Sequence, residues 1–208
     1  MQTSGFSGIL NRTMEWLMRL AYLNIIWILF TVIGLGIFTI FPATAAALGI
    51  ARKWVRKEDD FPVFRTYWTT FRKEFWHAQA LGGIFLIAGI VLYVDYIIFA
   101  AGSTSLLIGL KYITFVLIFF YFSVLIFLFP VLVHYEMTFF QAFKTAFFLG
   151  FLRPTYSLLI ISVLGILLII MFKLPGLLPF FGVSIPFLWI TIVTQKLFEK
   201  VALKYRVT

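Results

Sequence analysis

The sequence predicts an all-α membrane protein, a polytopic bundle whose hydrophobic helices cross the bilayer several times. Of the 208 residues, 62% are hydrophobic and only 12% are charged, whereas soluble domains are roughly 25% charged. Several apolar runs reach the roughly 18 residues that a helix needs to cross the hydrocarbon layer. Because backbone polar groups in lipid must bond within their own segment, these runs are expected to be helical. Residues 1–208 are expected to form one transmembrane domain.

Five spanning segments are expected, and the first is long enough to be an uncleaved helix. A signal peptide has an apolar region of about 7–15 residues, and the first apolar run exceeds that. A turn at residues 101–104 joins the second and third segments, and Leu174-Pro175-Gly176 joins the fourth and fifth, where the Pro-Gly pair permits a reversal. The five segments cover residues 20–41, 78–100, 105–133, 156–171 and 177–194.

The first segment has an alternative interpretation, in which the chain reverses between residues 34 and 42. Pro42 would then open a short second helix, because proline is favoured in the first helical turn. That arrangement has six spans and moves Arg12 and Arg19 to the other side of the membrane. The five-span arrangement is the one that we expect.

The distribution of Lys and Arg predicts the orientation in the membrane. One side carries thirteen of these cations, namely seven in residues 49–77, two in 134–155 and four in the C-terminal tail. The other side carries four, which are Arg12, Arg19, Lys111 and Lys173. The richer side is expected to be cytoplasmic, which places the C-terminus inside the cell and, with five spans, the N-terminus outside.

Two connections carry aromatic residues at the same spacing of three, four and four residues. Each set falls on one face of a helix, so we expect two amphipathic helices in the membrane interface with their rings in lipid. Docking of these rings against a partner protein is the alternative. The two sets are Phe64, Tyr67, Phe71 and Phe75, and Phe140, Phe143, Phe147 and Phe151.

The aromatic sets are part of a predicted internal repeat. A Phe-Pro pair precedes each set, with Pro42 in the first and Pro130 in the second, and both prolines are expected near the inner face of the membrane. The chain is therefore predicted to contain two pseudo-repeats, residues 20–100 and 105–171, followed by a closing helix at 177–194. Internal repeats are common in membrane transport proteins.

Asp95 is the most unusual residue within a predicted span. A carboxylate at the middle of the bilayer costs at least about 2.5 kcal/mol and usually has a partner. Asp95 precedes Ser103 by eight residues and Lys111 follows it by eight, so the two charges should lie at the same depth on antiparallel helices. An ion pair that staples the helices is favoured over a polar site for substrate or protons.

Polar and small residues in the first third of the chain predict close helix packing. Asn24, Trp27 and Thr31 recur at helical spacing, and such side chains form hydrogen bonds between membrane helices more often than they bind ligands. The block Pro42-Ala43-Thr44-Ala45-Ala46-Ala47 permits close approach to another helix, either within the chain or on a partner subunit.

Sequence motifs provide no indication of catalysis or of a bound cofactor. The chain has no G-x-x-x-x-G-K-[ST] phosphate loop, and His77 and His134 lack the spacing of a zinc-binding helix. The chain has no cysteine and a net charge of +9. Because the cations lie beside apolar segments, they predict contact with anionic lipid headgroups and not with nucleic acid. We therefore expect a protein that is not an enzyme and that binds neither metal nor cofactor.

Several short motifs resemble the YesL family of bacterial membrane proteins over nearly the whole chain. They are Leu23-Asn24-x-x-Trp27, Gly34-x-Gly36, Phe41-Pro42-Ala43-Thr44-Ala45-Ala46, Arg52-Lys53-Trp54 and Phe129-Pro130-Val131-Leu132. Members of that family are often encoded beside importers and enzymes for plant or host oligosaccharides, including pectin-derived rhamnogalacturonan. The resemblance thus implies a bacterial plasma-membrane protein linked to carbohydrate uptake, and it supplies no catalytic residues.

The leading functional hypothesis is a non-catalytic accessory subunit of an ABC-type oligosaccharide importer, which would contact the permease subunits. Its expected contact surfaces are the block from Pro42 to Ala47 and the two aromatic helices. A self-contained small transporter or channel, with Asp95 and Lys111 as its polar site, is one alternative. A membrane scaffold for envelope synthesis is another. The oligomeric state does not follow from the sequence.

Overall fold

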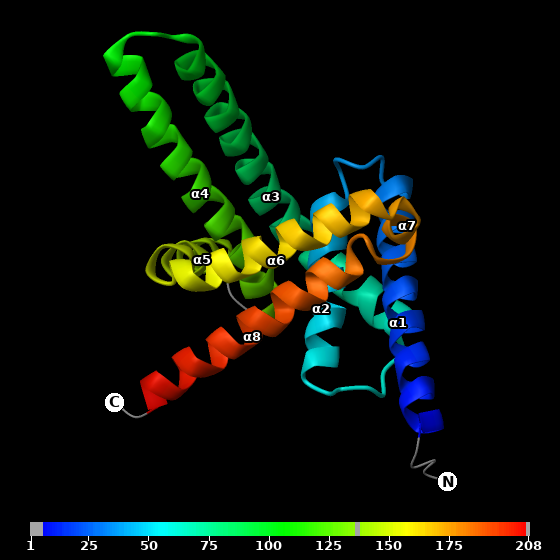
Figure 1. The fold of residues 1–208 in the computed structure, drawn as a ribbon. Helices are drawn as coiled ribbons and strands as arrows, with labels where there is room; N and C mark the ends of the chain where they lie inside the picture. The colour runs from blue at the N-terminus through cyan, green and yellow to red at the C-terminus, as the bar shows by residue number, and fades with distance from the viewer. Residues whose placement is uncertain (1–5, 136–137, 207–208) are drawn as a thin grey trace.

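The computed structural model describes residues 6–135 and 138–206, and these residues form helices and turns without any β-strand. Figure 1 shows the helices as an open bundle in which the α3–α4 hairpin leans away from the rest. The helices are α1 (Phe6–Ile33), α2 (Ile40–Val55), α3 (Val63–Ala101), α4 (Ser105–His134), α5 (Phe139–Leu152), α6 (Pro154–Lys173), a 3-10 turn η1 (Pro175–Leu177), α7 (Leu178–Phe181) and α8 (Ser184–Arg206).

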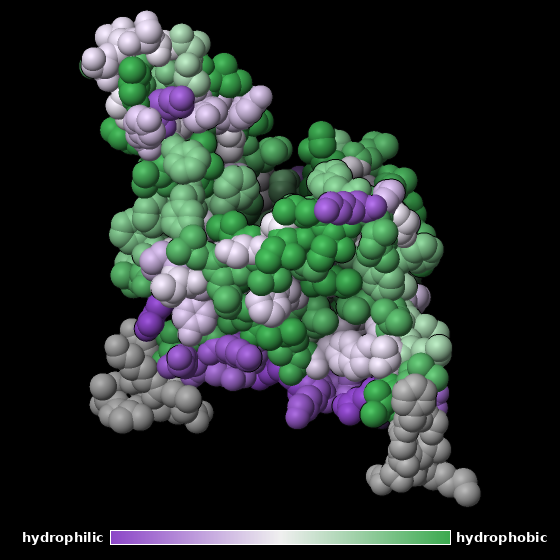
Figure 2. All heavy atoms as spheres, viewed as in Figure 1, coloured by the Kyte–Doolittle hydropathy of each residue, from purple (hydrophilic) through white to green (hydrophobic). Residues whose placement is uncertain are grey.

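Among the described residues, four helices are long and apolar enough to cross a membrane, and a fifth candidate is a bent pair. The four are α1, α3, α4 and α6, and the bent pair joins Pro175–Phe181 to Ser184–Val201 at an angle of 60°. The prediction of a helical membrane bundle is confirmed. Hydrophobic residues cover its body, and hydrophilic residues gather at the end where α1 begins and α8 ends (Figure 2).

The expected span at residues 20–41 is wrong, because the chain reverses within it. Helix α1 ends at Ile33, and α2 begins at Ile40. Leu35 and Gly36 take positive φ values of 57° and 72° in the turn between them, a conformation that ends a right-handed helix. The Thr39 hydroxyl donates to the carbonyl oxygens of Phe30 and Thr31, at 3.0 and 3.3 Å. These bonds satisfy carbonyls that the end of α1 leaves unpaired.

This reversal places the start of α1 and the end of α8 at the same end of the bundle (Figure 1), whereas five full spans would place them at opposite ends. The Arg19 guanidinium lies 2.7 Å from an Asp59 carboxylate oxygen, which ties α1 to the connection between α2 and α3. Arg12 and Arg19 therefore join the basic side of the protein. The six-span alternative describes this arrangement if the 16-residue α2 crosses as a short helix.

Labelling of single cysteines with a membrane-impermeant maleimide tests this arrangement, since the chain has no cysteine of its own. We expect Asn11→Cys and Asp60→Cys to react from one side of the membrane and Ser103→Cys to react only from the other. All three positions are exposed in the structure. A difference in their labelling would therefore report the side of the membrane and not burial of the cysteine within the protein. Reaction of the Asn11→Cys and Asp60→Cys variants from opposite sides would contradict the reversal between α1 and α2.

Helix α2 forms the centre of the bundle and packs against α1, α3, α4 and α8. Ala43, Ala45, Ala46 and Ala47 have no exposed surface, because their small side chains allow neighbouring helices to approach closely. Most of the block from Pro42 to Ala47 thus lies in the core of the chain, and Thr44 is half-buried. This packing agrees with the expected contact between helices of the same chain, and contact of the block with a partner subunit stays a prediction.

The first aromatic set belongs to the core and not to an interfacial helix. Its residues form the first turns of α3, a continuous helix of 39 residues. Tyr67 is fully buried and Phe71 is 7% exposed, and the Tyr67 hydroxyl donates to the carbonyl oxygen of Ala43 at 3.1 Å. The rings fill the space beside the alanine-rich helix α2. Phe75 is half-buried, and only Phe64 is largely exposed.

The second aromatic set lies on a helix of its own, α5, which is the arrangement expected for a helix at the membrane surface. Its four rings, Phe140, Phe143, Phe147 and Phe151, are between 39% and 79% exposed. The opposite face of α5 carries Ala142, Ala146 and Gly150, which are buried where α5 packs against α4. The two halves of the expected repeat therefore differ. Pro42 also begins a helix, whereas Pro130 lies in the last turns of one.

Candidate functional site

An apolar groove opens on the lipid-facing surface where α4 diverges from α6. It has a volume of about 650 Å³ and is lined by α2, α4, α6 and α8. The rings of Phe41 and Phe129 stack at a centroid distance of 6.2 Å and join α2 to α4 along the groove. Leu168 and Phe187 contribute from α6 and α8. The groove is thus assembled from segments that are far apart in the sequence.

The chemistry of the groove suits an apolar occupant. Among the described lining residues, Thr44 has the only polar side chain, and its hydroxyl lies 3.3 Å from the Trp27 indole nitrogen that donates to it. Burying the hydroxyl groups of a sugar without hydrogen-bond partners would be unfavourable. Acyl chains or the side chains of another membrane helix would meet no such penalty.

At Gly165 the backbone of α6 itself forms part of the wall of the groove, because glycine has no side chain. A Cβ atom placed on Gly165 would meet no atom within 4 Å, although the residue lies in the middle of α6 and lines the groove. Contacts between membrane helices are enriched in small residues, which let two backbones approach. Gly165 therefore marks a place where a second helix could pack closely. This position could not be predicted from the sequence, since a single glycine in an apolar helix is a weak signal.

Asn24 holds together the break between α7 and α8. Its side-chain amide is fully buried and donates to the carbonyl oxygens of Pro179 and Leu178, at 2.7 and 3.4 Å. Its side-chain oxygen accepts from the backbone N–H groups of Val183 and Ser184, at 2.8 and 3.3 Å. Broken membrane helices expose backbone groups to substrates in some transporters. Here Asn24 satisfies those groups within the chain.

Asp95 and Lys111 do not form the expected ion pair. They lie on the neighbouring helices α3 and α4 and are both half-buried, but no salt bridge or hydrogen bond joins them in the described chain. Equal distance from a turn fixes the depth of two residues and leaves the direction of their side chains open. Neither residue lines the apolar groove.

Trp27 and Thr31 are the other two side chains of the first predicted span that were expected to form hydrogen bonds between helices. Trp27 joins α1 to α2 through Thr44, and the Thr31 hydroxyl is buried without a hydrogen-bond partner. Within residues 6–135 and 138–206, no group of three His, Asp or Glu side chains is placed to hold a metal ion.

The helices and their lipid-facing groove define the chain as a multi-pass helical membrane protein in contact with the bilayer. Residues 20–96 match the family model described as "Protein of unknown function, DUF624". The chain belongs to this family, which includes YesL of Bacillus subtilis (strain 168). It is 37% identical to that uncharacterized protein over 191 residues, which cover 91% of this chain and 90% of YesL.

Two further relatives from the same strain are also described as uncharacterized proteins. YteU is 35% identical over 185 residues, which cover 89% of this chain and 83% of YteU. YesV is 32% identical over 168 residues, which cover 81% of each protein. No solved structure matches the chain. The family resemblance noted in the sequence is therefore confirmed, and these relatives carry no description of an activity.

Proposed function

We propose that the chain is a non-catalytic accessory subunit of a bacterial ABC-type oligosaccharide importer, in the plasma membrane with both termini in the cytoplasm. The link to sugar uptake rests on the resemblance to the YesL family, which implies association with importers of pectin-derived and related oligosaccharides. The cytoplasmic assignment rests on the excess of Lys and Arg at the end where α1 begins and α8 ends.

The apolar groove is the observation that carries this proposal. Its occupant would be a membrane-spanning helix of a permease subunit, packed against Gly165 and the rings of Phe41 and Phe129. A protein that moved sugar through itself would need a lining of hydrogen-bonding groups, whereas this lining is apolar apart from Thr44. The groove therefore favours a role in binding another membrane protein over a role as the sugar pathway.

Filling the groove tests the proposal. We expect Gly165→Leu to reduce recovery of permease subunits at least about tenfold, because the added side chain occupies the space of the partner helix. The measurement is mass spectrometry of proteins that copurify in a mild detergent from the native host, grown on complex plant oligosaccharides. The chain itself should fold normally, since the new side chain meets no atom of the protein at its Cβ.

Gly109→Leu provides the matched control. Gly109 lies in α4 outside the groove, and a Cβ there also meets no atom within 4 Å. This variant should copurify the same subunits as the unmodified chain. Recovery of permease subunits at equal levels with both variants would exclude the groove as the contact, and recovery of none with the unmodified chain would contradict the accessory-subunit function.

A further inference from the structure

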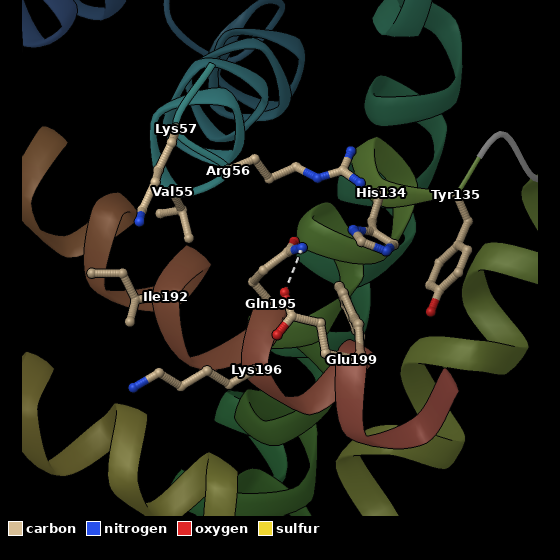
Figure 3. A pocket seen from close by; sticks show the side chains of 10 residues that line it. Val55, Arg56, Lys57, His134, Tyr135, Ile192, Gln195, Lys196 and Glu199 are labelled. Carbon is tan, nitrogen blue, oxygen red and sulfur yellow. Dashed lines mark hydrogen bonds between the residues drawn. The ribbon is translucent and has the colours of Figure 1, made fainter. Parts of the chain in front are cut away.

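A second cavity, of about 620 Å³, lies at the basic end of the bundle and shares no lining residue with the apolar groove. It is framed by the end of α2, the end of α4 and the middle of α8. Figure 3 shows the lining residues Arg56 and Lys57 at the end of α2, Lys196 on α8, and His134 and Tyr135 at the end of α4. The end of α2 and one face of α8 thus bring three cations to one space beside the end of α4.

Positive charge predominates in this cavity. Arg56, Lys57 and Lys196 are exposed to it, and Glu199 supplies the one carboxylate among its described lining residues. The Gln195 amide donates to Glu199 at 3.3 Å. The Arg56 guanidinium lies 3.9 Å from the Glu58 carboxylate, which makes a loose ion pair. The lining therefore has three cations and one anion.

Buried polar atoms beside the cavity lack hydrogen-bond partners. Arg52 donates to the Val133 carbonyl at the end of α4, at 2.9 Å, but its Nε is buried without a partner, as is Nδ1 of His134. A helix C-terminus carries partial negative charge, about half an elementary charge, and this bond from Arg52 offsets part of it at α4. Burial also raises the pKa of the Tyr135 phenol, which keeps its hydroxyl available as a donor.

The backbone of Lys57 adds an independent indication. Lys57 has a φ of 60°, the left-handed conformation that glycine usually adopts after a helix. For a residue with a Cβ, this conformation costs roughly 1–2 kcal/mol. Glycine would relieve that cost but would remove the amine that borders the cavity. Non-glycine residues in such conformations cluster at functional sites.

We propose that this cavity binds the phosphate group of an anionic phosphate ester. Phosphate oxygens accept hydrogen bonds from Arg and Lys, and Val55, Ile192 and Phe198 form an apolar wall for the rest of the molecule. Basic pockets between membrane helices on the cytoplasmic side bind lipid headgroups. A phospholipid headgroup and a soluble phosphate ester share this chemistry. The inference is independent of the partnership with an importer.

Lys57→Gly is the most informative variant, because it separates stability from binding. The purified protein in dodecyl maltoside is titrated with dioctanoyl phosphatidylglycerol, with dioctanoyl phosphatidylcholine and with inorganic phosphate, and the rise in Tm is measured. We expect Lys57→Gly to have an equal or higher Tm without ligand. Its half-saturating concentration of phosphatidylglycerol should be about fivefold higher, the effect of one cation near a phosphate. Lys196→Gln should also weaken binding about fivefold.

Arg65→Gln is the matched control, since Arg65 is an exposed cation of α3 that does not line the cavity. Saturation by phosphatidylglycerol alone supports a lipid headgroup as the ligand, and saturation by inorganic phosphate as well supports a soluble phosphate ester. Equal responses to phosphatidylglycerol and phosphatidylcholine without a response to phosphate would overturn the proposal. So would equal weakening by Arg65→Gln and Lys57→Gly.

Discussion

Replacing Asn24 with leucine is expected to destabilise the folded protein by at least about 3 kcal/mol. The leucine would leave two carbonyl groups and two N–H groups of the break between α7 and α8 without their present partner. Each buried polar group without a partner costs about 1–3 kcal/mol. The fully buried position limits access of water to replace the lost bonds. The loss is measured as a fall in Tm in detergent, or as loss of the monodisperse peak in size-exclusion chromatography.

Asn11→Leu makes the same chemical change at an exposed position of the same helix, and it should leave Tm nearly unchanged. Asn24→Asp keeps an acceptor for Val183 and Ser184 but removes the donor to Pro179, so it should still destabilise the chain. A Tm for Asn24→Leu equal to that of Asn11→Leu would show that the bent pair does not depend on Asn24.

Replacing Ala46 with leucine in helix α2 is expected to have the second large effect on folding. Ala46 has no exposed surface and belongs to the cluster that includes Leu23, Ile50 and Tyr67. Overpacking a dense core costs about 1–3 kcal/mol and occasionally more. Because α2 contacts four other helices, a displacement of α2 disturbs them together. We expect low yields of folded protein and a lower Tm.

Ala80→Leu is the control for this variant. Ala80 is an exposed position of α3, where the same increase in size points away from the core. Its yield and Tm should match those of the unmodified chain. Equal stability of the Ala46 and Ala80 variants would mean that α2 does not have the central position described above.

The class of fold and several helix limits could be predicted from hydropathy. The expected spans at 105–133 and 156–171 lie within one or two residues of α4 (Ser105–His134) and α6 (Pro154–Lys173). The prediction of a span at residues 20–41 was wrong because the turn after α1 consists of apolar residues. Leu35 and Gly36 turn the chain. Because no polar residue lies between Thr31 and Thr39, the hydropathy stays high across the turn and does not mark it.

Side-chain spacing predicted faces of helices but not what covers them. Tyr67 and Phe143 hold equivalent positions in the two aromatic sets, yet Tyr67 is buried against α2 and Phe143 is 39% exposed. Alanine-rich α2 packs against α3, which carries the first set. That contact belongs to the tertiary structure and does not follow from the spacing of side chains. The spacing of Asn24, Trp27 and Thr31 predicts hydrogen bonds between helices, and the Asn24 amide donates to the Pro179 carbonyl of α7. Its partners, however, lie about 155 residues further along the chain, beyond the reach of any local pattern.

The most direct test of the proposed importer subunit is site-specific photocrosslinking from the apolar groove in the native host. A benzophenone amino acid at Leu168, which lines the groove and is 52% exposed, is compared with the same group at Ile113 of α4. Ile113 is 58% exposed and lies outside the groove. With cells grown on complex plant oligosaccharides, we expect a crosslink from position 168 to an importer permease subunit and none from position 113. Crosslinks to lipid alone from both positions, or to the permease equally from both, would contradict the proposal.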